Sequence, residues 1–165
     1  MKKYLAIIAI ALCAMAHASA STKVDDVKFY AMGGGASGQR LYSYIEGRGL
    51  ANLPTEMYNS NYITALAYDD EHQTLYAGSN TGYLGAAVNG RPMQELERVM
   101  QPILALYYES STQTLWIAGG QNATAVIYKY NVVTRVLTQA LQHNGPWFFG
   151  ALTGTNEAIY AEGAA

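Results

Sequence analysis

The chain has 165 residues and a formal net charge of −2, from 10 Lys or Arg against 12 Asp or Glu. Its basic residues are scattered, so nothing in the charge pattern favours a nucleic-acid or anionic-membrane partner. The single cysteine, Cys13, excludes an intrachain disulfide.

The first 20 residues have the pattern of a secretory signal peptide. Two lysines precede an apolar run from Leu5 to Ala16, which is too short to cross a bilayer. The segment Ala18-Ser19-Ala20 is a small-x-small cleavage signature. We therefore expect cleavage after Ala20 and a periplasmic or secreted mature chain with no membrane span. A transmembrane anchor is the alternative interpretation of the same residues.

The mature chain repeats itself. Residues 63–76 and 103–116 are identical at seven of 14 positions without a gap. Two glycines and two tyrosines, Gly33, Gly34, Tyr42 and Tyr44, align 86 positions later with Gly119, Gly120, Tyr128 and Tyr130. A last copy begins at Ala151, 46 positions after Ala105. Self-similarity at a period of this size indicates stacked supersecondary units.

Each copy is predicted to form four short antiparallel strands. In the third copy these cover residues 103–108, 114–117, 125–130 and 136–141, and turn-forming residues separate them. The fourth strand of the second copy is ambiguous, because residues 93–100 also fit a short amphipathic helix. We interpret this segment as a strand because the other copies have a strand there.

Four strands in 40–46 residues describe a blade of a β-propeller. The predicted fold is all-β, a propeller-like array of four-stranded antiparallel blades within residues 21–165. The first copy lacks its first strand and the last copy has two strands, which gives 13 strands, about three to three and a half blades, and an incomplete ring. The copies lie near residues 28–54, 62–101, 103–142 and 148–163.

An incomplete ring has two explanations. The chain is the N-terminal part of a longer propeller, or a second chain completes the ring. Truncation is favoured because the last predicted strand would be redundant in a joined ring. In both cases exposed blade faces lead us to expect self-association of the purified mature chain.

Two segments resemble a known family. Leu115-Trp116-Ile117-Ala118-Gly119 and Ile103-x-Ala105-Leu106-x-Tyr108 are similar to the repeats of bacterial sensor-type (two-component regulator) propellers. The resemblance covers residues 28–163 and implies the fold more than a signalling role. Ala118 stands where that family usually has glycine, and the His and Trp-Asp signature of the WD40 type is lacking.

The predicted ligand-binding face is the end of the blades that carries the loops between the second and third strands and those between consecutive blades. Amides that hydrogen-bond and rings that stack suit recognition of a protein, a peptide or a glycan. The alternative is that the amides cap turns and the rings pack between blades. The candidates are Asn59, Asn61, Tyr62, Asn80, Gln121, Asn122, Asn144 and Trp147.

The densest polar cluster is Asp69-Asp70-Glu71-His72. A metal or acid–base site is one interpretation, and a hairpin turn is the favoured one. The glycine run of residues 33–38 lacks the lysine of a phosphate-binding loop and is interpreted as a turn. Trp116 and Tyr76 occupy equivalent positions and are predicted to lie buried between adjacent blades.

The sequence predicts no catalytic residue, no metal and no cofactor. The favoured function is a non-enzymatic binding or scaffolding domain in the bacterial envelope. The alternatives are the N-terminal fragment of a periplasmic propeller enzyme and the sensor domain of a signalling receptor.

Overall fold

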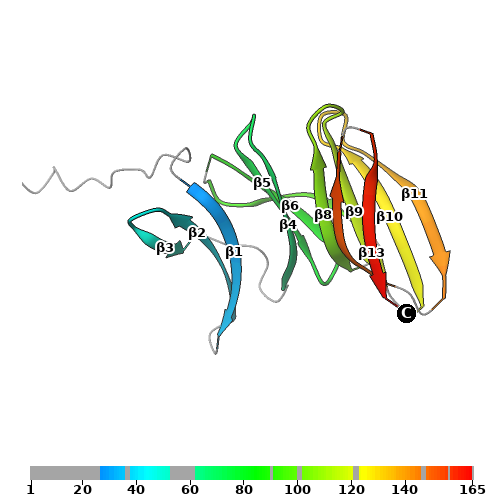
Figure 1. The fold of residues 1–165 in the computed structure, drawn as a ribbon, viewed down its shortest axis with the longest axis horizontal. Coiled ribbons are helices and arrows are strands. Elements are labelled where there is room, and N and C mark those ends of the chain that lie inside the picture. Colours follow the sequence, from blue (N-terminus) through cyan, green and yellow to red (C-terminus); the bar gives the residue numbers. More distant parts are fainter. Residues whose placement is uncertain are drawn as a thin grey trace, which may run out of the picture.

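The computed structural model describes residues 27–35, 38–52, 62–89, 91–99, 102–120, 123–145, 148–155 and 157–164. These residues form 13 strands in four antiparallel sheets, with no helix among them (Figure 1). The predicted signal peptide, residues 1–20, lies outside the described residues. We call the sheets blades 1 to 4 in chain order.

Blade 1 has three strands, β1 (Val27–Gly35), β2 (Gly38–Ile45) and β3 (Gly49–Asn52), in that spatial order. The sequence predicted a first blade without its first strand, and the described residues of this blade contain the three strands that were expected. The glycine run that was interpreted as a turn is in part strand, because Gly33 to Gly35 belong to β1 and pair with β2. Antiparallel pairing satisfies their backbone groups inside the ladder.

Blade 2 contains β4 (Ile63–Asp69), β5 (Thr74–Ser79), β6 (Tyr83–Val88) and β7 (Gln94–Arg98). The segment that also fitted a helix is therefore a strand, as predicted. Its backbone pairs antiparallel with β6, and the ladder satisfies donors and acceptors at the edge of β6 that would otherwise stay unpaired.

Blade 3 contains β8 (Ile103–Glu109), β9 (Thr114–Gly120), β10 (Thr124–Asn131) and β11 (Val136–Asn144). Blade 4 contains β12 (Phe148–Gly154) and β13 (Ile159–Ala164), and within the described residues these two strands pair only with each other. Within the described residues, blades 2, 3 and 4 contain the strands that the repeat predicted.

The repeat extends to irregular details of the backbone. Gln73 and Gln113, identical in the two central copies, both have positive φ, at 49° and 52°, where β4 turns into β5 and β8 turns into β9. A register shift lies between Leu84 and Gly85 on β6, and another lies at the equivalent place between Ile127 and Tyr128 on β10. The copies therefore share turn geometry and bulges as well as sequence.

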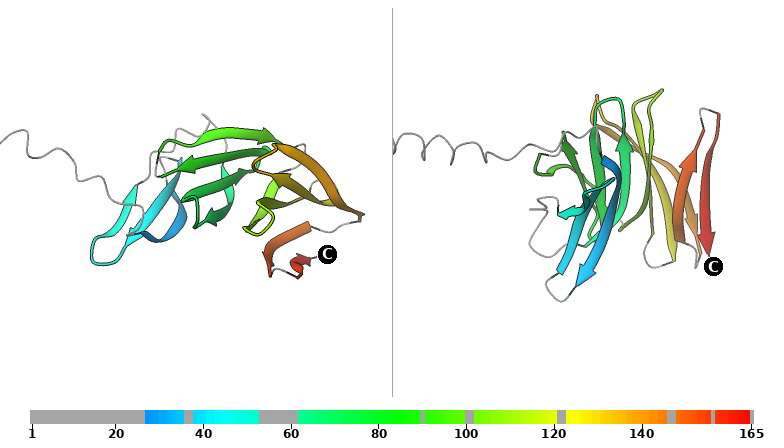
Figure 2. Two further views of the ribbon diagram at one scale, coloured as in Figure 1. Left: turned by 90° about the horizontal axis from the view of Figure 1, so that it is seen from above. Right: turned by 60° about the vertical axis from the view of Figure 1, so that its left-hand side comes forward.

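The blades follow one another around an arc, each with one face towards the next (Figure 2). The larger core cluster lies between blades 2 and 3 and includes Tyr76 and Leu84 from one side and Leu115, Ile117 and Tyr130 from the other. A smaller cluster joins blades 1 and 2 and includes Leu75 and Met93, with Tyr30 of β1 packed against it. Burial between blades is thus the main source of stability.

Candidate functional site

The structure brings two of the predicted binding residues together. The Tyr62 backbone N–H donates to the Asn80 side-chain oxygen at 3.0 Å, and the Asn80 N–H donates to the Tyr62 carbonyl at 2.9 Å. The start of β4 is thereby tied to the end of β5 at one end of blade 2. The amide of Asn80 closes this junction, while the Tyr62 residue is 58% exposed.

A different junction lies at the same end of blade 3. The Gly145 N–H donates to the Ala123 carbonyl at 2.7 Å, which ties the end of β11 to the loop before β10. Asn144 is exposed, and its side-chain oxygen accepts a hydrogen bond from the Gln142 amide at 2.9 Å. The other candidates lie outside the described residues: Asn59, Asn61, Gln121, Asn122 and Trp147.

The acidic cluster of the β4–β5 turn has a structural role. Asp69 is 2% exposed, and its Oδ1 accepts the backbone N–H groups of Glu71 and His72 at 3.1 and 3.2 Å. Its Oδ2 lies 2.8 Å from Nδ1 of His72, and the hydroxyl of Tyr108 on blade 3 also donates to this carboxylate. This is a capped turn. Within the described ranges no three His, Cys, Asp or Glu side chains gather as metal ligands would.

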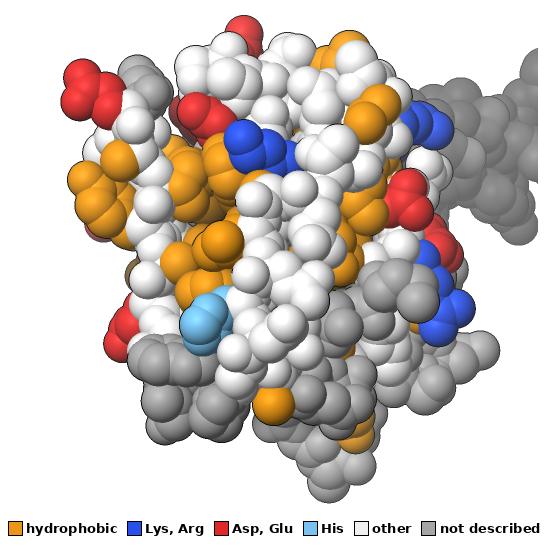
Figure 3. All heavy atoms as spheres, turned by 90° about the vertical axis from the view of Figure 1, so that its right-hand side faces the viewer, with side chains coloured by type: hydrophobic (Ala, Val, Ile, Leu, Met, Phe, Trp, Pro, Cys, Tyr) orange, Lys and Arg blue, Asp and Glu red, His pale blue; other side chains and the backbone are white. Residues whose placement is uncertain are grey.

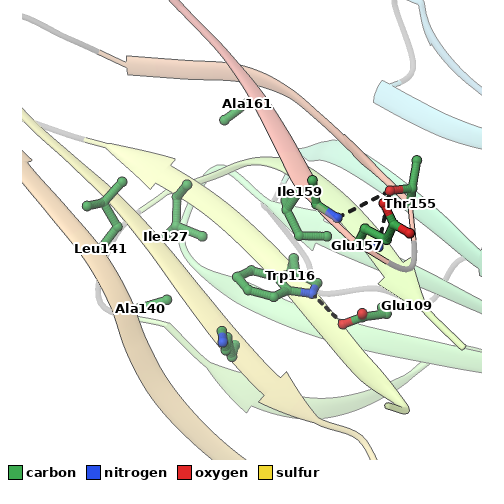
Figure 4. Close-up of a pocket in the computed structure, with 11 residues that line it drawn as sticks. Glu109, Trp116, Ile127, Ala140, Leu141, Thr155, Glu157, Ile159 and Ala161 are labelled. Carbon is green, nitrogen blue, oxygen red and sulfur yellow. Dashed lines mark hydrogen bonds between the residues drawn. The ribbon is translucent and has the colours of Figure 1, made fainter. Parts of the chain in front are cut away.

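A cavity lies between blades 3 and 4, and the sequence did not predict it. Its volume is about 440 Å³, inside the range of roughly 300–1,000 Å³ that is typical of ligand pockets. Figure 4 shows Ile127, Ala140 and Leu141 on the blade 3 side facing Ile159 of blade 4. The complete lining is Glu109, Trp116, Ile127, Lys129, Ala140, Leu141, Thr155, Glu157, Ala158, Ile159 and Ala161.

The polar groups of this cavity gather around Trp116. The indole Nε1 donates to Oε2 of Glu109 at 3.0 Å (Figure 4). The same oxygen accepts the hydroxyl of Thr112 at 2.8 Å. The Lys129 ammonium lies 4.4 Å from the centre of the indole ring, in cation–π geometry. The cavity therefore combines an aromatic surface, an aliphatic wall, two carboxylates and one ammonium group.

The two equivalent aromatic residues have different surroundings. Tyr76 is 4% exposed and stacks on Tyr108 of blade 3, with ring centres 5.4 Å apart. The prediction of a ring buried between blades is confirmed for Tyr76. Trp116 is only partly buried, so the prediction is wrong for this ring, and the described part of blade 4 beside it has two strands.

The apolar wall of the cavity continues onto the molecular surface. Leu141 is 49% exposed on β11, and Val136 on the same strand is also exposed. Figure 3 faces this end of the molecule and shows groups of hydrophobic side chains between polar ones. Exposed apolar surface beside a cavity is typical of a binding site.

No family model matches the chain, and no curated protein matches it. A chain of the crystallised nidogen/laminin complex is similar in structure, with a TM-score of 0.61 and 12% identity over 77% of this chain and 49% of that one. The extracellular domain of the putative one-component system BT4673 from B. thetaiotaomicron is also similar, with a TM-score of 0.56 and 16% identity over 79% of this chain and 20% of that one.

Identities this low establish the fold alone, and the chain spans half or less of these structures. The chain is an all-β, propeller-like repeat protein with four-stranded antiparallel blades. The predicted fold class and the resemblance to propeller repeats are thereby confirmed. In the described ranges, no helix is long and apolar enough to cross a membrane.

Proposed function

We propose that this chain is a secreted or periplasmic, non-enzymatic binding domain that recognises a polypeptide partner at the cavity between blades 3 and 4. The cavity itself carries the proposal, because it joins an aromatic ring, an aliphatic wall and exposed apolar surface. Ile127, Leu141 and Ile159 make this lining more apolar than a glycan needs, whereas peptide side chains fit it well.

The similar structures support this class of function. One is a chain of a complex between nidogen and laminin, and the other is the extracellular domain of a putative one-component system. Export of this chain is supported by the basic, apolar and small-residue pattern of residues 1–20. The predicted loop face with Tyr62, Asn80 and Asn144 remains a second surface on which a partner could be recognised.

Two measurements test the proposal. A reporter enzyme that is active only after export, fused behind Ala165, should be active with the full chain and inactive without residues 1–20. Binding is followed through Trp116, which becomes the only tryptophan in the variant Trp147→Phe because the chain has two.

Short strand-forming peptides should change the Trp116 fluorescence saturably, and neutral oligosaccharides should leave it unchanged. The matched variant Trp116→Phe retains Trp147 and reports on binding elsewhere. A response to oligosaccharides alone would contradict a polypeptide ligand and indicate a glycan. An inactive reporter with the full chain would overturn the proposed secreted or periplasmic location.

A sensor role is the second candidate, and the similarity to the BT4673 extracellular domain favours it. In that case the codons that follow Ala165 in the gene should encode a membrane-spanning helix and a signalling domain. Sequencing that region distinguishes a receptor input domain from a free binding domain.

A further inference from the structure

We infer that Asn89 is a modification site, at which the side-chain amide is lost spontaneously as ammonia and an aspartate or isoaspartate remains between β6 and β7. The inference is independent of the proposed function. It follows from a comparison of two Asn-Gly pairs, Asn89-Gly90 and Asn144-Gly145, which share the same two residues but have different surroundings. Gly90 lies outside the described residues and contributes its chemical identity alone.

The reaction needs an asparagine that is followed by a small residue. The backbone nitrogen of the following residue loses its proton to hydroxide and attacks Cγ of the asparagine, and the C–N bond of the side-chain amide breaks to release ammonia. Glycine favours the attack because it has no Cβ in the way. Water then opens the cyclic imide at Cγ, which gives aspartate, or at the backbone carbonyl carbon, which gives isoaspartate. One water is consumed and one ammonia is released, without oxidant or reductant.

The structure leaves Asn89 open to this reaction. The residue is exposed, and among the described residues none forms a hydrogen bond with its side chain. The Arg91 N–H donates to the Val88 carbonyl at 3.0 Å, so Asn89 occupies the second position of a tight turn, where its φ is 51°. Asn is favoured at such a position because it tolerates a positive φ. Its Cγ is therefore in contact with water and hydroxide.

The fold uses the backbone of residue 89 and not its side-chain amide. The Asn89 N–H donates to the Gln73 carbonyl at 3.0 Å, which joins this turn to the β4–β5 turn. Blade 3 makes the same connection with another residue, since the Val132 N–H donates to the Gln113 carbonyl at 3.0 Å. Valine has no amide, so the connection does not require one. Loss of the Asn89 amide is thus compatible with the native contact.

The second Asn-Gly pair is protected at both reacting groups. The Gly145 N–H donates to the Ala123 carbonyl at 2.7 Å, so the nitrogen that would attack is already held. The Asn144 side-chain oxygen accepts the Gln142 amide at 2.9 Å, which holds the group that would be attacked. The reaction at Asn144 must first break these bonds, and it is therefore slower than at Asn89.

Two further asparagines, Asn80 and Asn131, are expected to be stable. The side-chain oxygen of each accepts a backbone N–H group, at 3.0 Å and 2.8 Å respectively. They are followed by Thr81 and Val132, whose branched Cβ hinders attack by the backbone nitrogen. Of these asparagines, Asn89 alone combines a glycine neighbour with an unheld side chain in the described part of the chain.

The products differ in their effect on the turn. Both add a negative charge, because an aspartate carboxyl is ionised at neutral pH. Isoaspartate also inserts its Cβ into the backbone between Val88 and Arg91, whose hydrogen bond closes the turn. The variant Asn89→Asp supplies the charge alone. Stored protein should therefore unfold at a lower temperature than fresh Asn89→Asp.

The test is peptide mapping of the purified full chain during storage at mildly alkaline pH. Trypsin separates the two sites, because Asn89 lies in the peptide 49–98 and Asn144 in the peptide 136–165. Mass spectrometry with fragmentation measures the converted fraction at each asparagine. Conversion at Asn144 should be at least about 10-fold slower than at Asn89, because two hydrogen bonds that must break raise the barrier by that order.

Three controls separate local chemistry from the protection that the fold provides. In guanidinium chloride the two Asn-Gly pairs should react at similar rates, because unfolding removes the bonds around Asn144. Gly90→Ala should slow conversion at Asn89 and leave Asn144 unchanged. Gln142→Ala, which removes one of the bonds that hold Asn144, should speed conversion there and leave Asn89 unchanged. Circular dichroism shows that both variants remain folded.

A folded chain in which Asn89 stays intact while the unfolded chain is converted would overturn the inference. Equal rates at Asn89 and Asn144 in the folded chain would overturn the assigned protection of Asn144 and the contrast on which the inference rests. Undiminished conversion in Gly90→Ala would contradict attack by the following nitrogen. These outcomes leave the proposed binding function untouched, because its peptide titration monitors Trp116 and not this turn.

Discussion

Equivalent residues lie at the boundary between blades 2 and 3 and at the boundary between blades 3 and 4, but they are buried to different extents. In the first, Tyr76 lies in a closed core under Tyr108 and Tyr130. In the second, Trp116 lines an open cavity between Glu109 and Ile159. The comparison shows that burial in this fold depends on the strands of the following blade as much as on the sequence of a blade itself.

The inner part of each boundary is filled by one small and one large residue, and the two boundaries place these residues on opposite blades. The first pairs the small Ala67 with the large Tyr108 in one cluster. At the second boundary, the aligned residues are the large Tyr107 and the small Gly154. A Cβ built on Gly154 would lie 2.6 Å from the Tyr107 ring, so glycine is required there. Only the outer part of the second boundary, where a third strand would lie, remains open.

The largest difference is expected when the two equivalent rings are removed. Tyr76→Ala should destabilise the protein by about 3–5 kcal/mol, because it removes a fully packed ring from the core. Trp116→Ala removes a larger but partly exposed ring, and should cost only about 1–2 kcal/mol. Urea unfolding followed by circular dichroism measures both values. Equal losses would mean that blade 4 covers Trp116 in solution.

A second contrast concerns the carboxylates at the ends of β4 and β8. Asp69 is buried and accepts two backbone N–H groups and the Tyr108 hydroxyl, so Asp69→Ala should cost about 2–3 kcal/mol. The aligned Glu109 is partly exposed and bonds only side chains of its own blade, so Glu109→Ala should cost less than about 1 kcal/mol.

The same unfolding experiment measures both carboxylate variants, and Asp70→Ala is a control on the exposed part of the turn. If the cluster bound a metal ion, divalent cations would stabilise the natural protein, and these variants would detect that effect. If divalent cations raised the melting temperature of the natural protein and left Asp69→Ala unaffected, the capped-turn interpretation would be wrong.

The sequence predicted the repeat, the thirteen strands and their order because side-chain periodicity is a local property. Residues 93–100 show its limit: their apolar spacing also fitted a helix, and only pairing with β6 decides for a strand. The sequence did not predict the cavity, because the cavity depends on which side chains of blade 4 approach Trp116. The sequence partly predicted the role of Asp69, since an Asp before a turn is a common cap.

Alkaline pH should weaken the filled boundary selectively. Burial, and then the charge of Asp69, raise the pKa of Tyr76 from 10.0 to about 12. Because the folded state holds this proton more tightly than the unfolded state, the associated stability is complete below pH 10 and is lost as the pH rises towards 12. The indole of Trp116, which takes the place of the Tyr76 phenol at the open boundary, does not itself titrate in this range.

Urea midpoints between pH 8 and 12 measure this effect. Tyr76→Phe should flatten the alkaline decline, although Tyr30 and Tyr108, whose pKa values are also raised by burial, should leave a residual slope. An unchanged slope in Tyr76→Phe would show that this hydroxyl is accessible to solvent, and would remove the pH difference between the two boundaries.

The smallest effect is expected from Lys129, whose ammonium covers the open side of Trp116. An exposed cation–π contact contributes about 0.5–1 kcal/mol, so Lys129→Met should lower stability by no more than that. In the Trp147→Phe background the same change should shift the emission of Trp116, because a charge near the ring has been removed. Arg98→Met, which removes another cation–π contact, over Tyr83 in blade 2, is the control with no expected change in emission. If Lys129→Met left the emission unaltered, the ammonium would lie away from the indole in solution, and the cavity would present the Trp116 ring to its ligand without a neighbouring cation.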